Sequence, residues 1–382
     1  MKWIMATGLF FCVFILNYST ALAQKIKIDK WRNITTELQQ KKKIGRFKSN
    51  NNVDAIAYKG RYYMSCRSAP THFASEKTRM YILSSTDMHD WKVEHEIAMG
   101  RDKREPRFAI QGDSLYMYFF TGSKHWYEFK PDALLVTATD GNGKWSESAS
   151  TGLDGYVPWR VRIKDGTMYM SAYYGVDLYN KNHKGDLRLF TSTDARTWQP
   201  LTAQPQIGEP TAEEGEFIFD KNGHLYGTIR LESTGSLIVR ADSNDLGNWK
   251  YNRSKFKYDS ALLFEHNDEI YLIARRNVPG EVDRSKKWLG ENTRRLLNLA
   301  KYSLSSKKTA LYKLDKTTLD IVHVMDFESN GDNAFPAIVK LSDHQYGIFN
   351  YSSDIDTDNK IWIEGQIGKT YLYYSTLTFE EN

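Results

Sequence analysis

The 382-residue chain contains little cysteine. Its two cysteines are Cys12 and Cys66, and only Cys66 remains in a mature chain that has lost its N-terminal residues, as argued below. One cysteine cannot form a disulfide within the chain, so the fold must be stabilised by a large buried core. The length permits such a core, and no linker rich in Pro or Gly divides the sequence. We therefore expect a single domain.

The sequence also lacks the features of several function classes. The formal net charge of +5 is small for this length, and a nucleic-acid-binding protein would cluster its basic residues on one face. The chain has no Cys or His cluster with metal-ligand spacing, no Gly-x-Ser-x-Gly nucleophile elbow and no Gly-x-Gly-x-x-Gly loop. We therefore expect no nucleic-acid partner, no metal ion and no cofactor.

Residues 1–23 match a secretory signal peptide. Lys2 precedes an apolar run from Met5 to Leu16, and Ala21-Leu22-Ala23 is a small-x-small cleavage site. The apolar run is too short to span a bilayer comfortably, and Cys12 lies inside the run, which argues against a lipoprotein anchor. We expect a mature domain of residues 24–382 with no transmembrane segment, located in the periplasm or secreted.

Aromatic residues are abundant, at 14% of the chain, and they mark a repeat. A tight turn followed by an aromatic-rich strand recurs six times, and each turn also follows a short apolar strand. The six turns are Lys59-Gly60, Gly112-Asp113, Asp165-Gly166, Asn222-Gly223, Asn267-Asp268 and Asp343-His344. Asp-Gly and Asn-Gly are favoured in hairpins because both central residues need positive φ.

A second motif, Ser-x-Asp-x-x-x-Trp, falls after the third strand of a unit. It occurs at Ser85 to Trp91, Ser192 to Trp198 and Ser243 to Trp249, with a looser copy from Thr139 to Trp145. We expect each Asp to accept hydrogen bonds from the amides of its own turn and each Trp to pack between neighbouring sheets.

Four antiparallel strands repeated about every 50 residues are typical of a propeller blade. The sequence therefore predicts an all-β fold, a six-bladed β-propeller of four-stranded antiparallel blades. The fifth unit is longer, and we expect its charged insertion from Pro279 to Thr293 to form a loop over one face.

Propeller geometry brings polar side chains of all six units to one mouth of the central channel. The first strand of each blade lines the channel, and its start lies on the same face as the end of the second strand. The residues that this rule places there are Asn52, Asp54, Arg67, Glu105, Arg107, Trp159, Arg160, Tyr174, Glu214, Glu216, Arg230, Asp259, Arg275, Arg276, Asp332, Asn333 and Tyr351, with His72 in a loop at the mouth.

Carboxylates dominate the catalytic candidates. Glu214 and Glu216 alternate on a strand, so we expect both to point to one face, where like charges raise one pKa and create an acid. The alternative is a structural ion pair with Arg230. Asp54 is a candidate general base, as in five-bladed glycosidases of the arabinanase type, or else a cap of its strand. His72 could donate a proton near neutral pH, or could be a surface histidine.

The remaining candidates would bind substrate. Guanidinium groups hold carboxylates in a bidentate fork, so we expect substrate contacts among Arg67, Arg160, Arg230 and Arg276, with structural ion pairs as the alternative. The further candidates for substrate binding are Arg107, Trp159, Asp259 and Asn333.

In these motifs the sequence resembles the sialidase superfamily. The Ser-x-Asp turns are similar to its Asp boxes, shortened by one residue. The fourth unit, from Glu214 through Asn222-Gly223 to Arg230, follows the family's order of Glu, apolar strand, Gly turn, strand and Arg. The resemblance implies that Glu214 is the functional carboxylate of its pair, that Tyr351 is the nucleophile and that Arg67 is a first-blade arginine of the site.

Two positions depart from the family pattern. Where sialidases have an Arg-Ile-Pro motif, whose arginine binds the substrate carboxylate, this chain has Asn51-Asn52-Val53-Asp54, and no Asp follows Arg67 closely as the acid/base. The resemblance therefore implies a relative that acts on a different sugar, with an acidic one among the candidates.

These patterns predict an exo-acting glycoside hydrolase that removes a terminal sugar from an oligosaccharide or polysaccharide. Hydrolysis needs one group to protonate the leaving oxygen and a base or nucleophile on the other face of the sugar. Two alternatives remain open at this point. One is a polysaccharide lyase with Tyr or His as base, and the other is a propeller that binds glycans without catalysis.

Overall fold

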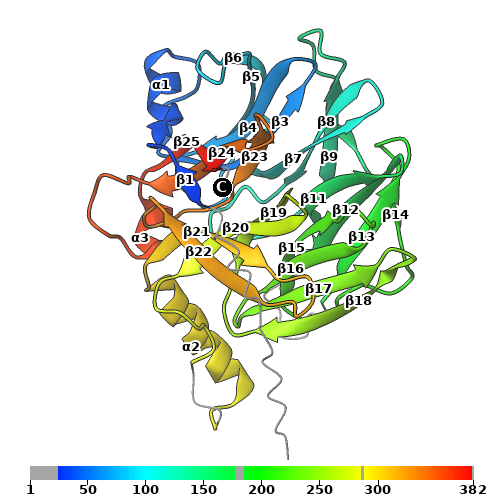
Figure 1. Ribbon diagram of the computed structural model, residues 1–382. Helices are drawn as coiled ribbons and strands as arrows, with labels where there is room; N and C mark the ends of the chain where they lie inside the picture. Colours follow the sequence, from blue (N-terminus) through cyan, green and yellow to red (C-terminus); the bar gives the residue numbers. More distant parts are fainter. Residues whose placement is uncertain (1–24, 177–184, 285–287, 381–382) are drawn as a thin grey trace, which may run out of the picture.

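The computed structural model describes residues 25–176, 185–284 and 288–380. The signal peptide expected at residues 1–23 lies outside this part of the chain. The strands form six antiparallel sheets around a common centre (Figure 1). This arrangement confirms the predicted six-bladed β-propeller. Blade 1 contains β3 (Ser49–Tyr58), β4 (Arg61–Ala69), β5 (Arg79–Ser85) and β6 (Lys92–Ile97).

The next four blades also take their strands consecutively from the chain. Blade 2 contains β7 (Lys103–Gln111), β8 (Ser114–Thr121), β9 (Leu134–Thr139) and β10 (Ala149–Ser150). Blade 3 contains β11 (Tyr156–Lys164), β12 (Thr167–Tyr174), β13 (Leu187–Ser192) and β14 (Gln199–Pro200). Blade 4 contains β15 (Ala212–Phe219), β16 (Leu225–Leu231), β17 (Ser236–Asp242) and β18 (Asp245–Ser254). Blade 5 contains β19 (Asp259–His266), β20 (Glu269–Asn277), β21 (Lys307–Leu314) and β22 (Ile321–Phe327).

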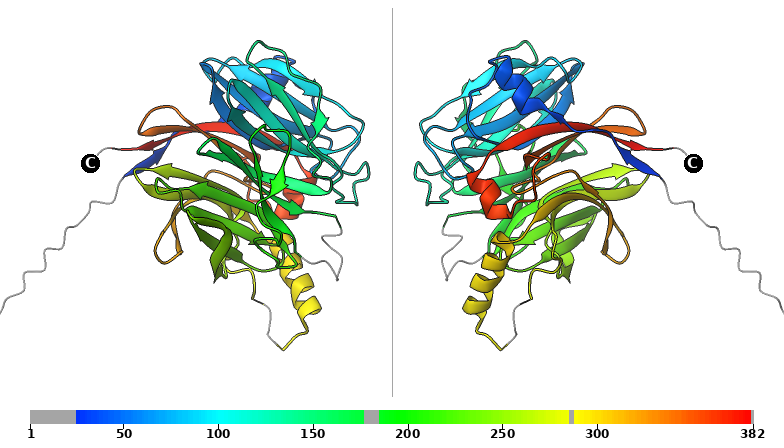
Figure 2. Two further views of the ribbon diagram at one scale, coloured as in Figure 1. Left: turned by 90° about the vertical axis from the view of Figure 1, so that its right-hand side faces the viewer. Right: turned by 90° about the vertical axis from the view of Figure 1, so that its left-hand side faces the viewer.

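Blade 6 combines both ends of the described chain. Its strands β23 (Ala337–Lys340), β24 (Gln345–Ser353) and β25 (Thr370–Phe379) are joined by β1 (Ile26–Ile28) and β2 (Arg32–Asn33), which both pair with β25. Ile26 lies opposite Phe379 in the antiparallel ladder, and Figure 2 shows β1 beside β25. The outer strand of the last blade thus comes from the N-terminal side, which closes the ring.

The six dipeptide turns all join the first and second strands of a blade, as predicted. In blade 1 both Lys59 and Gly60 have positive φ, at 46° and 71°, and in blade 3 Asp165 and Gly166 have 50° and 75°. Two positive φ values in sequence match the twist of the strands that the turn connects.

The Ser-x-Asp motifs form the expected turns in two of three cases. Asp87 accepts hydrogen bonds from two amides of its own turn, at 2.8 Å each, and Asp194 does the same at 2.8 and 2.7 Å. Trp91 packs edge-on against Phe349 of blade 6. In the third copy Asp245 instead begins β18, directly opposite Asp242, because β17 and β18 are joined by a shorter connection.

The described residues contain three helices outside the blades: α1 (Ile34–Gln40), α2 (Glu291–Ser303) and α3 (Trp362–Ile367). The expectation of a loop from Pro279 to Thr293 is wrong at its C-terminal end, where Glu291 begins α2, which projects from blade 5 (Figure 1). Tyr302 near the end of α2 is 3% exposed and anchors the helix to the propeller. Within the described ranges, no helix combines the length and apolarity needed to cross a membrane.

Candidate active site

A cavity of about 500 Å³ lies at one mouth of the channel, and every blade contributes to its wall. The inner strands begin here and the second strands end here, as propeller geometry requires. The lining residues from the six blades are Asn52, Glu105, Tyr173, Glu213, Glu214, Arg230, Ser260, Arg275, Phe335 and Tyr351.

β-Bulges at the starts of the inner strands direct side chains into this cavity. The register of the first two strands shifts by an extra residue in each of blades 1 to 5. Four residues at these shifts have positive φ and line the cavity: Asn52 (46°), Glu105 (57°), Glu214 (51°) and Ser260 (51°). Positive φ is uncommon for residues with a side chain and is often found at functional sites. The bulges therefore determine which residues of each strand face the cavity.

Glu214 lies on the cavity wall, where protein partners fix both of its carboxyl oxygens. Its Oε1 pairs with Arg230, and its Oε2 accepts a hydrogen bond of 2.6 Å from the Ser260 amide. The sequence left two alternatives for Glu214, a site carboxylate or an ion pair with Arg230. In the structure Glu214 both lines the cavity and forms that ion pair. Glu213, which the sequence did not single out, lines the cavity beside it, and burial raises the pKa of its carboxyl well above the usual range.

Glu105 provides a carboxyl group with a raised pKa in the same cavity. Its side chain is 13% exposed. Burial raises its pKa to about 7, opposed by Arg107 and reinforced by the charge of Glu214. Asn52 donates a hydrogen bond of 3.3 Å to Oε1, and Oε2 has no hydrogen-bond partner among the described residues. Glu105 can therefore donate a proton near neutral pH.

Tyr351 lies on another wall of the cavity, within a buried polar cluster. Its hydroxyl donates to Asp332 Oδ1 at 3.1 Å and accepts from Arg275 at 3.3 Å. Burial and the adjacent Asp332 raise the pKa of the Tyr351 hydroxyl well above 10, so the phenol is neutral at rest. Asp332 also accepts a hydrogen bond of 3.0 Å from the indole of Trp362 in α3.

His72 completes this cluster. Its Nδ1 lies 2.7 Å from Asp332 Oδ2. Burial lowers the pKa of His72, although Asp332 opposes the shift. The loop that carries His72 is held by Arg67, which donates to the carbonyl oxygens of Thr71 and Phe73 at 3.3 and 2.8 Å.

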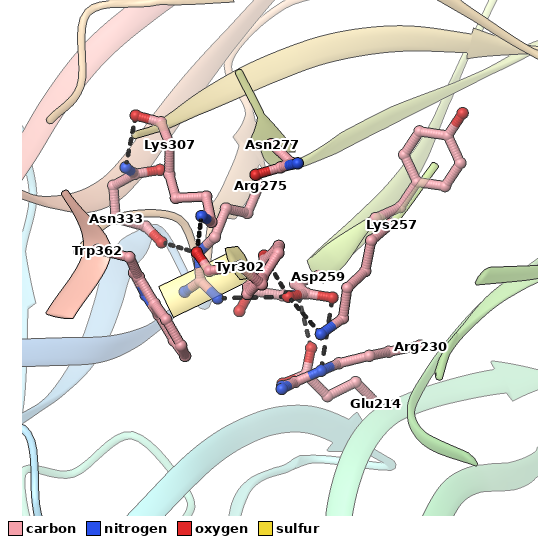
Figure 3. Close-up of polar contacts among 12 residues, drawn as sticks. Glu214, Arg230, Lys257, Asp259, Arg275, Asn277, Tyr302, Lys307, Asn333 and Trp362 are labelled. Atoms are coloured by element: carbon pink, nitrogen blue, oxygen red, sulfur yellow. Dashed lines mark hydrogen bonds and ion pairs between the residues drawn. The ribbon is translucent and has the colours of Figure 1, made fainter. Parts of the chain in front are cut away.

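Asp259 does not line the cavity but supports two arginines that do. Figure 3 shows it between Arg230 and Arg275, at 3.5 and 3.7 Å, with Lys257 at 3.5 Å. Tyr302 of α2 donates a hydrogen bond of 2.5 Å to its Oδ2. Although burial acts in the opposite direction, these cations lower the pKa of Asp259. Asp259, which the sequence suggested as a substrate contact, therefore holds Arg230 and Arg275 in place from behind the cavity wall.

Glu216 lies away from the cavity, in contrast to the expectation that it shares a face with Glu214. It is fully buried, and it pairs with Arg160 at 2.6 Å and Arg162 at 3.1 Å. Strict alternation fails because the register shift in β15 separates Glu213 from Glu216. Asp54 belongs to the same network, 3.6 Å from Arg160, and accepts a hydrogen bond of 2.6 Å from the Phe108 amide.

Arg107 and Trp159 form the floor beneath the cavity. The Arg107 guanidinium lies 4.2 Å from the ring centre of Phe335, which lines the cavity, and 4.6 Å from the ring centre of Trp159. Both residues are about 1% exposed. These two buried side chains therefore pack beneath Phe335 at the inner side of the cavity.

Three further candidates make structural contacts and do not line the cavity. Arg67 is fully buried and pairs with Asp102 at 2.9 Å. Asn333 binds backbone oxygens of Lys307 and Gly331. Arg276 forms a bidentate pair with Asp326, with N–O distances of 2.7 and 2.5 Å, and its neighbour Arg275 lines the cavity instead. Adjacent strand residues point to opposite faces, and only one of them can face the pocket.

A loop within blade 2 and helix α3 form part of the rim. Trp126 and Tyr127, in the loop between β8 and β9, are 68% and 66% exposed and line the mouth. Trp362 of α3 lines it as well. Sequence reasoning missed these residues, as it missed Arg104 and Glu232, because loop geometry is not encoded in the strand repeat. Across the described ranges, no group of three or more His, Cys, Asp or Glu side chains has an arrangement suited to a metal ion.

The sequence matches no known family model and no curated protein. Solved structures do match. A Dyadobacter fermentans protein of unknown function is similar over 93% of this chain and 99% of its own, with a TM-score of 0.62 and 13% identity. Trypanosoma rangeli sialidase in complex with sialic acid has a TM-score of 0.59 and 11% identity over 87% of this chain. The chain has the sialidase fold.

A viral protein shares this fold. Phage phi92 endosialidase has a TM-score of 0.59 and 11% identity, over 88% of this chain and 68% of its own. The match covers only 54% of the trypanosomal sialidase chain, so this protein spans about half the length of that enzyme. Similarity at this level of identity establishes the sialidase fold, which confirms the architectural part of the resemblance found in the sequence.

Proposed function

We propose that the protein is a glycoside hydrolase that removes a terminal sugar from a glycan. The proposal rests on one observation: Glu105, whose pKa burial raises to about 7, and Glu214, which is held by Arg230 and the Ser260 amide, line the same pocket as the hydrogen-bonded pair of Tyr351 and Asp332. A carboxyl group that can hold its proton near neutral pH and a second carboxyl group fixed in the same pocket can supply the acid and the negative charge that glycoside hydrolysis requires.

The shape of the pocket supports removal of a terminal unit. The buried side chains of Arg107 and Trp159 fill the space beneath Phe335 on the inner side of the cavity, which favours binding of the end of a glycan. The exposed rings of Trp126 and Tyr127 at the rim offer apolar faces on which the sugar of the leaving group can stack. Substrate would enter from one side with its end sugar first.

In the proposed first step, Tyr351 Oη attacks the anomeric carbon and its proton passes to Asp332. The bond between the anomeric carbon and the leaving oxygen breaks, and Glu105 donates its proton to that oxygen. Glu214 stabilises the positive charge that develops on the sugar ring. In the second step, water attacks the anomeric carbon and gives its proton to Glu105. Tyr351 leaves and recovers its proton from Asp332.

The Glu105→Gln variant tests this assignment. We expect it to lower kcat/KM about 10²- to 10⁴-fold on glycosides with a sugar leaving group, because the acid is lost. Activity on a dinitrophenyl glycoside of the same sugar should fall much less, since that leaving group needs no proton. The wild-type rate on the sugar substrate should also decline as the pH rises through about 7, where Glu105 loses its proton, and the variant should lack this decline.

Glu96→Gln serves as the control, because Glu96 is a half-exposed residue on β6 that pairs with Arg79. It should leave both activities unchanged. An equal loss on both substrates in Glu105→Gln, or an unaltered pH profile, would remove Glu105 as the acid. Binding of glycans by the wild-type protein without release of any sugar would favour a non-catalytic glycan-binding propeller.

A further inference from the structure

We infer that the sugar bound in this pocket carries no anionic group. This inference rests on the proposed function, since it names the substrate class of the same site. It follows from how each arginine of the pocket is already paired, and from the carboxyl groups that share the wall.

Arg230 is surrounded by carboxylates. It pairs with Glu214 and Glu232, and Glu213 and Asp259 lie at 3.9 and 3.5 Å. A guanidinium group has five N–H donors in a fixed plane, and here they face residues of the protein. Arg230 therefore has little capacity left for a carboxylate of the substrate.

Arg104 and Arg275 are engaged in the same way. Arg104 donates to Asp102 at 2.5 Å and to the His72 carbonyl oxygen at 2.7 Å. Arg275 donates to the Asn333 carbonyl oxygen at 2.7 Å and to the Tyr351 hydroxyl at 3.3 Å, and Asp332 lies at 3.9 Å. Neither arginine presents a fork to the pocket as a bidentate carboxylate site would require.

The lining of the pocket carries five glutamates, Glu105, Glu128, Glu213, Glu214 and Glu232, against these three arginines. Asn52, at the start of the first blade, binds Glu105 through its amide. Glu214 and Glu232 already hold Arg230, so an anionic sugar would have to compete with these carboxyl groups in a largely buried site, which is unfavourable. Sugar hydroxyl groups, in contrast, can donate to carboxylate oxygens.

The test uses mixed oligosaccharides prepared from neutral and from uronate-containing polysaccharides, with the released monosaccharide identified by mass spectrometry. Aryl glycosides in matched pairs, such as glucoside and glucuronide or galactoside and galacturonide in both anomers, then give kcat/KM ratios. We expect a sugar without carboxylate or sulfate to be released, and the matched acid to be at least 100-fold poorer. Preferred release of a uronic or sialic acid would overturn the inference and leave the proposed function standing.

A variant that removes one carboxylate from the pocket tests the same inference by a second route. Glu232→Gln removes one carboxylate from Arg230, so we expect the preference for the neutral member of a pair to fall at least tenfold. Asp326→Asn is the matched control, since it removes the carboxylate of Arg276 outside the pocket, and it should not change the ratio. An unchanged ratio in Glu232→Gln would count against the inference.

Binding separates failure of the inference from failure of the proposed function. Calorimetry with the same neutral and acidic oligosaccharides on the Glu105→Gln protein needs no turnover. Tighter binding of the acidic member overturns the inference even if the wild-type protein releases no sugar. Tighter binding of the neutral member without release by the wild type supports the inference and contradicts hydrolysis. Binding of neither kind overturns both.

Discussion

At the scale of single residues, the pocket depends on which of two neighbours faces inwards. Arg275 and Arg276 are adjacent in β20. Arg275 donates to the Tyr351 hydroxyl, whereas Arg276 pairs with Asp326 of β22 in the same blade. Glu213 and Glu214, in contrast, both reach the pocket because a bulge interrupts the alternation. Whether a residue faces the pocket is thus decided by the local register of its strand.

This pair gives a matched prediction. Arg275→Lys keeps the charge but loses the planar fork, so we expect kcat/KM to fall about 10- to 100-fold, the equivalent of one hydrogen bond to a charged group. Arg276→Lys should change kcat/KM less than twofold. Melting curves of both variants exclude a difference in folding. Similar losses in the two variants would show that Arg275 does not act through the pocket.

At the scale of elements, the propeller ring is closed by a short N-terminal strand. β1 pairs with β25, and Ile26 and Ile28 pack against the core between blades 5 and 6. Without β1 the end of β25 from Leu377 to Phe379 would lose its ladder partner, and only β2 would still pair with β25.

We therefore expect removal of residues 24–28 from the mature protein to reduce the free energy of unfolding by about 2–4 kcal/mol, from the two half-buried isoleucines and their ladder. Urea denaturation measures the change. Lys25→Ala is the control, because its pair with Glu380 is exposed and should contribute less than about 1 kcal/mol. An unchanged midpoint in the truncated protein would mean that β1 does not hold the ring closed.

At the scale of the whole molecule, a stabilising network is buried apart from the pocket lining. Glu216 and Asp54 both pair with Arg160, all three side chains are buried, and none of them lines the cavity. Removing one partner of such a network leaves an unpaired buried charge and destabilises the protein strongly. Arg160, which the sequence suggested as a substrate contact, instead belongs to this buried network.

Export remains a prediction at this scale. Cleavage after Ala23 would leave a mature chain that begins just before β1, so the ring could still close. We expect protein expressed with residues 1–23 to be recovered outside the cytoplasm, with Gln24 as its first residue. Terminal sequencing of the purified protein checks this. Recovery of the intact chain from the cytoplasm would contradict it.

The sequence by itself determined the number of blades, the turns within them and the end of the ring at which side chains gather. These features follow from local rules, because a two-residue turn with positive φ and a period-two strand are properties of consecutive residues. It also placed Glu214, Arg230 and Tyr351 at the mouth, and all three line the cavity.

Only the tertiary structure decided which side chains face the pocket. Glu105 acquires its raised pKa from burial and from Glu214, which is more than 100 residues away along the chain. Asp332 reaches Tyr351, and Asp259 reaches Arg230, only because the blades are arranged in a ring. Bulges and ion-pair partners depend on contacts between blades, and for this reason the sequence placed Glu216, Arg67 and Arg276 at a mouth that they do not line.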